Sequence, residues 1–315
     1  MMRTKNGIAL IGGATYDITG TLLGDAHRRD SNPSRIHTGC GGVGRNIAEN
    51  LARLGLDVRF LSAFGTDALS GELIASCEAI GIDTRLSYIK EGARACTYID
   101  LLDKRGELLL AASDMALTEE IPLDLLSEAV KDLNAHRLLI LDANLTEDAL
   151  RCVAAHSESP LVGEAVSIAK VNRLRGILPR LYAVKANIGE LAALTDREIK
   201  DDRDLAAAGA CLLAAGVKRV FVTMGPDGAC CIDGDGMTRT PGFPAEVRSV
   251  TGSGDAFCAA VVYGLYHGLP TEDILLFGAA MSHITLKSPF AVSRDMTEAE
   301  VLRVRDLLAP PALGR

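Results

Sequence analysis

The chain has 315 residues, of which 48% are hydrophobic, and 33 Lys and Arg against 41 Asp and Glu give it a formal net charge of −8. That length is enough to bury the core of one or two α/β domains. An acidic chain repels the phosphate backbone of DNA and RNA, so we do not expect a nucleic-acid polymer as partner. A single nucleotide can still be held by local backbone amides and a divalent cation.

The eight cysteines and the first residues of the chain bear on its compartment. No two cysteines form a C-x-x-C pair, which indicates reduced thiols rather than a disulfide framework or a zinc site. The chain passes from two Met residues into the apolar segment 7–13 without a secretory signal. No uncharged apolar run reaches the ~18 residues of a membrane span. We therefore expect a cytoplasmic protein without a membrane partner.

Short apolar runs alternate with amphipathic stretches along most of the chain. The predicted strands lie at 7–13, 57–65, 137–144, 181–187 and 218–225. Between the first two, Val43, Ile47, Leu51 and Leu54 recur at helical spacing until Gly55 ends the pattern. Such alternation predicts an α/β fold: a three-layer sandwich with a mostly parallel central sheet between two layers of helices.

Two segments interrupt this alternation. Residues 14–38 and about 94–112 have the pattern of β-hairpins, and the second turns at residues 104–106. A small β-sheet built from them would project from the core as a lid. Because no repeat, low-complexity tract or linker divides the chain, we predict one domain spanning residues 1–315 that carries this lid.

The segment 249–268 carries the strongest chemical signal. Nearly all of residues 256–266 are apolar or aromatic, which predicts a helix buried on every side. Gly252, Ser253 and Gly254 form its entry. Backbone N–H groups at a helix start are unpaired and lie at the positive end of the helix dipole, so this entry can hold an anion at close approach.

Asp255 stands in the first turn of the same helix, beside the expected anion. A bystander carboxylate would repel that anion, whereas one that accepts the proton of an attacking hydroxyl group would be useful there. Ser253 and Asp255 are also residue types that cap helix starts. Local spacing favours the two interpretations about equally.

A second glycine-rich segment, 38–55, begins another predicted helix. Gly41 and Gly42 permit a close approach of the backbone to a ligand, and Asn46 can present a donor and an acceptor to vicinal hydroxyl groups. Taken alone, the segment is better explained as a flexible loop. Asp17, just after the first strand, can accept hydrogen bonds from two sugar hydroxyls, although a turn-forming role is locally favoured.

Two further strand ends carry polar or glycine-rich turns. Asn187 and Glu190 lie three residues apart at a strand-to-helix junction, where their oxygen atoms could hold a hydrated Mg²⁺ or form a capping box. Residues 223–228 could border a nucleotide or simply form a turn. All these motifs occur together at the ends of successive strands, where α/β sheets bind ligands, and this favours the functional interpretation.

In their order along the chain, these motifs resemble the ribokinase-type (PfkB) carbohydrate and nucleoside kinase family over essentially its full length. GGVGRNIAENLARLG resembles the N-terminal signature, FGTDALSGELI the following G-x-D-x-x-G element, KANIGE the N-x-x-E motif and VTGSGDAF the C-terminal G-A-G-D signature. The resemblance implies a ribokinase-like fold with a small β-sheet lid. It also implies a kinase that uses ATP and Mg²⁺.

The resemblance assigns a role to each candidate residue. Asp255 would be the catalytic base that deprotonates the acceptor hydroxyl, and Gly252, Ser253 and Gly254 would form the anion hole. The sugar would be held by Asp17, Gly41, Gly42 and Asn46. Mg²⁺ and the phosphates would be held, through water, by Asn187 and Glu190. The nucleotide would be bordered by Asn187, Thr223, Gly225 and Gly228.

Finer matches resemble one subgroup of the family, which phosphorylates the 5′-hydroxyl of pseudouridine. They are GGVGRN, VTGSGD, GGATYDITG and EAVSIAK, the last at residues 164–170. Arg45 would reach the substrate or a phosphate, or else remain a solvated residue of the first helical turn. The alternatives are a kinase for another sugar or nucleoside (ribose, adenosine, inosine or cytidine) and a non-catalytic nucleoside-binding regulator.

Three residues depart from the family pattern, and one of them is Ala186, which replaces a common Pro of the K-P-N form. Ser253 replaces the usual Ala of G-A-G-D, which should be harmless because the backbone N–H groups bind the anion. Ser249 stands where many relatives carry an acidic residue associated with a monovalent-cation site, so potassium dependence stays open. The sequence leaves the oligomeric state open, although the exposed edge of a small lid sheet could pair two copies into a homodimer, as in similar proteins.

Overall fold

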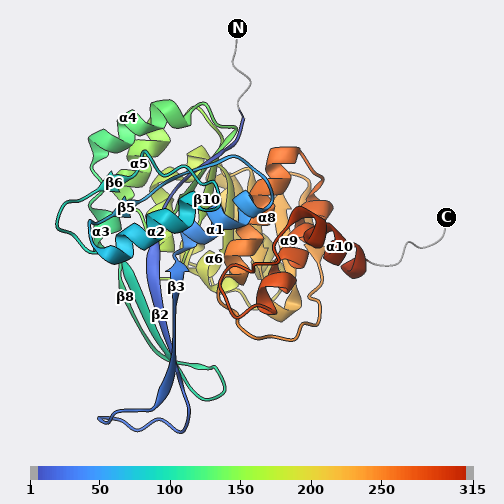
Figure 1. Ribbon diagram of the computed structural model, residues 1–315. Coiled ribbons are helices and arrows are strands. Elements are labelled where there is room, and N and C mark those ends of the chain that lie inside the picture. Colours follow the sequence, from blue (N-terminus) through green and yellow to red (C-terminus); the bar gives the residue numbers. More distant parts are fainter. Residues whose placement is uncertain (1–5, 310–315) are drawn as a thin grey trace.

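The predicted strands pair side by side in one sheet of the computed structural model, which describes residues 6–309 (Figure 1). In spatial order this eight-stranded sheet consists of β14 (Gly236–Thr240), β13 (Ala229–Asp233), β12 (Arg219–Thr223), β11 (Leu181–Asn187), β10 (Leu161–Glu164), β9 (Leu138–Asp142), β1 (Ile8–Ile11) and β4 (Val58–Leu61). The strands from β12 to β4 are parallel, and β13 and β14 are antiparallel additions at one edge. The mostly parallel sheet is therefore confirmed.

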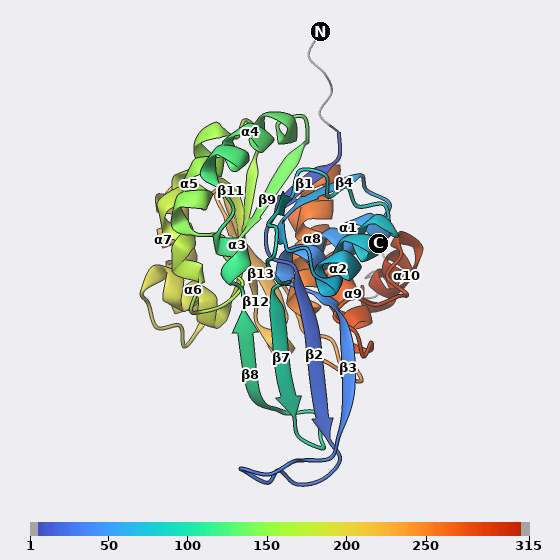
Figure 2. The same cartoon turned by 60° about the vertical axis from the view of Figure 1, so that its left-hand side comes forward.

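Helices cover both faces of this sheet (Figure 2). One layer contains α4 (Leu123–Leu133), α5 (Glu147–His156), the 3₁₀ helix η1 (Val171–Arg180), α6 (Ile188–Thr195) and α7 (Asp202–Ala214), with the short α3 (Ala116–Glu119) at its side. The other layer contains α1 (Val43–Arg53), α2 (Ala68–Glu78), α8 (Ser253–His267), α9 (Thr271–Leu286) and α10 (Glu298–Leu308). The predicted three-layer α/β sandwich is confirmed.

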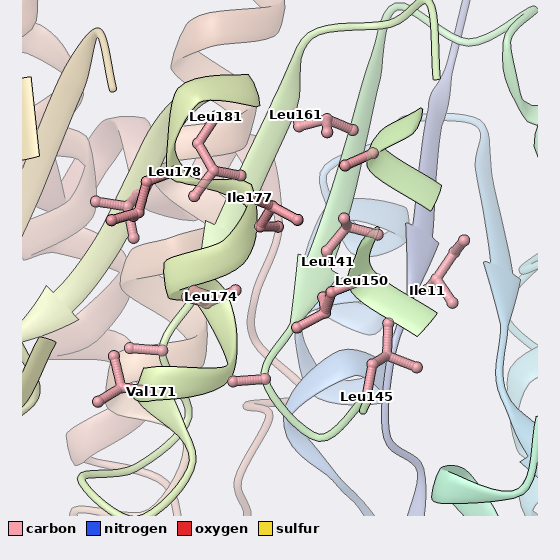
Figure 3. Close-up of a cluster of buried hydrophobic side chains, with 14 of the residues drawn as sticks. Ile11, Leu141, Leu145, Leu150, Leu161, Val171, Leu174, Ile177, Leu178 and Leu181 are labelled. Atoms are coloured by element: carbon pink, nitrogen blue, oxygen red, sulfur yellow. The ribbon is translucent and has the colours of Figure 1, made fainter. Parts of the chain in front are cut away.

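Successive side chains of the central strands point to opposite layers. Leu10 and Ile140 pack into the layer of α8, whereas Ile11 and Leu141 pack into the layer of α5 and η1. Figure 3 shows the second of these cores, where Leu141 lies close to Leu150 of α5. Every residue of β9 is buried, and residues 138–141 of this strand form a continuous apolar run rather than an alternating one.

Helix α8 is the buried helix that its sequence predicts. Residues 256–264 are all buried, and α8 packs against α1 and α9. A Cβ atom on Gly264 would overlap Ile274, and one on Gly278 would overlap Phe257, so these two glycines let α8 and α9 approach closely. The packing brings the first turn of α8 to the carboxyl ends of the parallel strands.

A four-stranded sheet projects from this body (Figure 2). Its strands, in spatial order, are β3 (Ser34–Gly41), β2 (Thr15–Leu22), β7 (Thr97–Leu102) and β8 (Leu108–Asp114). The β2–β3 and β7–β8 pairs are antiparallel hairpins, as the two irregular segments predict, and β2 joins β7 in parallel. The β7–β8 turn places Gly106 at φ +85°, a conformation that favours glycine.

Several elements differ from the sequence-based expectation. The run 57–65 divides into β4 and the short β5 (Ala63–Phe64), because the amide of Ser62 donates to Ser87 Oγ and β5 pairs with β6 (Tyr88–Ile89) instead of the central sheet. Strands β10, β13 and β14 are present in addition to the predicted strands. Among residues 6–309, no helix combines the length and the apolar character needed to cross a bilayer.

Candidate active site

The candidate site forms where the first turn of α8 meets the carboxyl ends of β9, β10 and β11. Asp142, Glu164 and Lys185 lie at or near the ends of these three strands, and all three side chains are buried. Asp255 approaches them from α8, and its charge interacts with that of each. The geometry follows from the fold, since parallel strands direct their carboxyl ends to one edge of the sheet.

Asp255 contacts the second glycine-rich segment directly. The side-chain amide of Asn46 donates from Nδ2 to Asp255 Oδ2 at 2.9 Å. Burial raises the pKa of Asp255 to about 6, although the Asn46 hydrogen bond and the positive charge of Lys185 oppose that rise. A carboxylate with such a pKa is ionised at neutral pH yet basic enough to accept a proton.

Asn46 keeps unused hydrogen-bonding capacity. Its Oδ1 atom is buried and has no hydrogen-bond donor in the described part of the chain. An incoming hydroxyl group could supply that donor. Asn46 therefore suits the predicted contact with a substrate hydroxyl beside Asp255.

The 252–254 loop is open only in part. Gly252 caps α8 at φ +80°, and a Cβ atom there would overlap the carbonyl oxygen of Ala291, so glycine is required. The amide and the hydroxyl of Ser253 both donate to Val250 O, at 3.3 and 2.8 Å. The backbone amides of Gly252, Gly254 and Asp255 make no hydrogen bond to the described residues and remain available for an anion.

The anion hole differs from the predicted one in this respect. Ser253 belongs to the turn before α8 and does not offer a free amide, whereas Asp255 contributes its own N–H group. Turn geometry explains the change, because the residue directly after the left-handed Gly252 folds back on Val250.

Lys185 and Glu164 are site residues that the sequence analysis missed. Their side chains are only 5% and 2% exposed, and Lys185 Nζ lies 3.1 Å from Glu164 Oε1. Burial raises the pKa of Glu164, while the ammonium group of Lys185 opposes that rise and favours the charged carboxylate. The available signal was the presence of charged residues inside otherwise apolar strands, since such residues are rarely buried without a partner.

Asp17 lies on β2 above the start of α1. Thr15 Oγ1 donates to its Oδ1 at 2.6 Å, and burial raises the pKa of Asp17 to about 6. A Cβ atom on Gly41 would overlap the Asp17 carboxylate. Gly42 caps α1 at φ +93°, where a Cβ atom would lie 2.7 Å from Gly13 O. Gly41 thus leaves room for the Asp17 carboxylate, and Gly42 lets its backbone pass close to the backbone of residues 13–15.

Arg45 is buried, which contradicts the interpretation as a solvated residue of the first turn. The side chain donates to Cys40 O at 3.0 Å and to Ser76 Oγ at 3.2 Å while pairing with Glu49 at 2.9 Å. It is thus not a solvated residue of the first turn. Its positive charge still acts on the Asp17 carboxylate, so a contact with a substrate beside Asp17 stays a prediction. Its contacts hold the end of β3 against α1 and α2.

Asn187 and Glu190 form the capping box of α6. Asn187 Oδ1 accepts from the amide of Glu190 at 2.9 Å, and Glu190 Oε2 accepts from the amide of Asn187 at 2.8 Å. No cluster of three metal-ligating side chains occurs in residues 6–309. Glu190 retains its other carboxylate oxygen, so the pair fits a hydrated Mg²⁺ held through water rather than a direct coordination sphere.

Thr223 is the last residue of β12 and is the register partner of Asn187 on β11, and Gly225 and Gly228 follow it along the chain. Gly225 and Gly228 have φ of +59° and +91° and close the turn at η2 (Gly225–Asp227). A Cβ atom on Gly228 would overlap Thr240 O. The glycines are therefore required by the turn itself, which lies at the same sheet edge as Asn187.

A further group of polar side chains joins the first loop to the 164–170 segment. Asp142 Oδ2 accepts from the amide of Gly13 at 2.8 Å and from Asn144 Nδ2 at 3.2 Å. Lys170 Nζ donates to Asn144 Oδ1 at 2.6 Å. Val166, in the 164–170 segment, adopts φ +65°, a backbone conformation that strains a β-branched residue. Such a conformation persists only where neighbouring residues hold the loop in place.

Ser249 takes part in a local turn. Its Oγ accepts from the amide of Thr251 at 3.2 Å. A hydroxyl group at this position lacks the negative charge that a carboxylate would offer to a cation.

Known proteins resemble this chain along most of its length. The model of the pfkB family carbohydrate kinases matches residues 5–296. Pseudouridine kinase of Escherichia coli strain K12 is 29% identical over 306 residues, which cover 96% of this chain and 97% of that protein.

Solved structures show a similar fold. A carbohydrate kinase from Agrobacterium tumefaciens is 29% identical and superposes with a TM-score of 0.82, covering 96% of this chain and 97% of the other. Ribokinase from Thermotoga maritima, 20% identical, superposes with a TM-score of 0.84 over 96% of this chain and 99% of the other. The fold is thus ribokinase-like.

The raised pKa of Asp255 predicts how its replacement affects stability. The folded-state pKa of about 6 lies above the ordinary 3.8, so the charged carboxylate costs stability once the pH exceeds both values. We expect Asp255→Asn to increase the free energy of unfolding at about pH 7.5 and to lose this advantage below about pH 4. Urea unfolding over a pH series measures the difference.

Asp124→Asn provides the matched control for this variant. It makes the same chemical change in the first turn of α4, where the side chain is exposed. A difference between Asp255→Asn and the unmodified protein that stayed constant from acidic to neutral pH would contradict the prediction.

Proposed function

The chain belongs to the pfkB family of carbohydrate kinases, and we propose that it transfers the terminal phosphoryl group of ATP to the 5′-hydroxyl of pseudouridine. As a member of that family it is a phosphotransferase with an alcohol acceptor. The observation that carries the proposal is the position of Asp255, which stands next to free backbone amides and bonds to Asn46.

The proposed reaction assigns a task to each part of the site. Asp255 accepts the proton as the acceptor O–H bond breaks, the freed oxygen forms a bond to phosphorus, and the bond from phosphorus to ADP breaks. The amides of Gly254 and Asp255 donate to the oxygens of the phosphoryl group in transit. Asp17 and the free Oδ1 of Asn46 accept hydrogen bonds from the sugar hydroxyls and orient the acceptor.

ATP and Mg²⁺ are the cofactors of this proposal. Glu190 and Asn187 would hold the hydrated ion through water, and the ion would neutralise charge on the phosphates. Thr223 and the turn after it lie along the same edge of the sheet and would border the nucleotide. The projecting sheet would act as a lid over the acceptor, since Asp17 lies on one of its strands.

Pseudouridine as the acceptor rests on sequence resemblance. The segments GGVGRN, GGATYDITG and 164–170 resemble the pseudouridine subgroup, and the E. coli relative is a pseudouridine kinase. The C-glycosidic bond of pseudouridine leaves an ordinary ribose 5′-hydroxyl, so the chemistry of transfer would be the same as for another nucleoside. Ribose, adenosine, inosine and cytidine are the competing acceptors.

The first test is Asp255→Asn, which removes the base and keeps the shape of the side chain. We expect the value of kcat to fall at least ~100-fold, with ATP binding retained, because an amide cannot accept the proton. Steady-state assays of ADP release, with isothermal titration of ATP, measure both quantities. Asp124→Asn should turn over normally, and substantial turnover by Asp255→Asn would remove Asp255 from its role as base.

The second test is a panel of acceptors. We expect kcat/KM to be highest for pseudouridine when ADP release is compared across pseudouridine, uridine, adenosine, inosine, cytidine and ribose. A higher value for another member would reassign the acceptor within the family. Binding of nucleosides without any turnover would instead indicate a non-catalytic regulator.

We also propose that two copies pair through the lid. In the lid sheet, register places Ile36, Leu101 and Leu110 in one row with Gly20. These three apolar side chains are 58%, 39% and 66% exposed. The same patch on a second copy would cover this apolar row through a twofold interface.

The pairing is tested by Leu110→Asp, which places a charge in the apolar row, on its edge strand β8. We expect the sedimentation coefficient to change from that of a dimer to that of a monomer. Leu307→Asp on α10 is the control, because its side chain is equally exposed at 71% but lies outside the lid. A monomeric unmodified protein, or a dimer that survives Leu110→Asp, would rule out this interface.

A further inference from the structure

Lys185 and Glu164 form a buried ion pair that the reaction as proposed does not use. The two residues are register partners on the adjacent strands β11 and β10. Lys185 Nζ and Glu164 Oε1 lie 3.1 Å apart, and both side chains are almost completely buried. Removing two charges from water is expensive, and an apolar pair of similar size would often be at least as stable. Stability alone therefore gives little reason for an ion pair here.

The ammonium group of Lys185 lies directly beneath the first turn of α8. A Cβ atom built on Gly254 would be 3.1 Å from Lys185 Nζ, so the ammonium group touches the backbone that carries the free amides. Glycine at 254 is the residue that leaves it the most room. Lys185 thus adds a full positive charge to the helix end that would bind the phosphoryl group.

Neither partner of the ion pair is saturated with hydrogen bonds. An ammonium group has three donors, and in the described part of the chain Lys185 Nζ donates only to Glu164. Glu164 Oε1 also accepts from the amide of Val166 at 3.4 Å, and the Cys258 thiol interacts with the carboxylate, while Oε2 meets no partner within hydrogen-bond distance in that part of the chain. Donors of Lys185 therefore remain for a ligand or for water at the carboxyl edge of the sheet.

We propose that Lys185, anchored by Glu164, is a positioning residue for phosphoryl transfer, which fixes the first turn of α8 and keeps the Asp255 carboxylate charged and correctly placed. This inference rests on the proposed function and extends it to a residue that lies below the anion hole.

Several charged groups face Asp255 from the surrounding elements. They are Asp17 of β2, Asp142 of β9, Glu164 of β10, Lys185 of β11 and Glu190 of α6. The carboxylates in this group disfavour a charged Asp255, and Lys185 favours it. Removing the positive charge and removing the Glu164 charge must therefore shift the titration of Asp255 in opposite directions.

The experiment compares Lys185→Met with Glu164→Gln. For Lys185→Met we expect kcat to fall about 10-fold or more, with the KM values of ATP and acceptor changed less than about 3-fold. The acid limb of its pH–rate profile should move to higher pH, and that of Glu164→Gln to lower pH. Lys131→Met is the control, since Lys131 is exposed on α4 and pairs with Glu128.

The opposite shifts separate positioning from simple support of the fold. Unchanged kcat in Lys185→Met, or acid limbs that stay in place or move together in the two variants, would overturn the proposal. If Lys185→Met does not fold, the direction of the shift in Glu164→Gln decides alone.

A second measurement needs no turnover. The carboxyl ¹³C signal of Asp255, assigned by its loss in Asp255→Asn, reports the pKa of that group in each variant. Absence of turnover in the unmodified protein would defeat the proposed function, while opposite shifts of this signal would still support the position of Lys185. Equal pKa values in both variants would overturn it even in an active enzyme.

Discussion

The hydrogen bond from Asn46 to Asp255 is the contact on which the arrangement of the site depends. It joins residues 209 positions apart, each in the first turns of a glycine-initiated helix. Both α1 and α8 are anchored by buried faces in the same layer. Packing along the whole length of each helix thus orients its first turn. The hydrogen bond forms where the first turns of the two helices meet. A carboxylate held in this way needs little rearrangement before it accepts a proton.

Glycine makes that convergence sterically feasible. At Gly252 and Gly42 the backbone adopts a positive φ and passes close to another segment of backbone, and at Gly41 a carboxylate occupies the space of the missing side chain. Flexible loops also contain glycines, and the sequence alone does not show whether a glycine makes a loop flexible or lets two chain segments approach closely. In this fold they permit contact between chain segments, and the loops that contain them are held in place by neighbouring backbone.

The electrostatics of the site follow from the concentration of acidic groups at one sheet edge. Asp17, Asp255 and Glu164 all have pKa values raised by burial, and further carboxylates lie close by. Such a site would repel a polyphosphate, so positive charge must be supplied locally. The helix dipole of α8 and the ammonium group of Lys185 provide part of it, and a divalent cation brought with the nucleotide would provide more.

The sequence by itself determined the fold class, because strand–helix alternation and a helix apolar on every side have few three-dimensional solutions. It also singled out Asp255, Asn46, Asp17 and the glycine-rich turns, since these residue types at strand ends have recognisable spacing. Tertiary structure decided what spacing cannot express. It placed Arg45 in internal contacts, tied the amide of Ser253 into a turn and brought Glu164 and Lys185 under Gly254. These outcomes depend on which strands become neighbours in the sheet and how closely a helix packs on them, and such long-range contacts leave no periodic pattern along the chain.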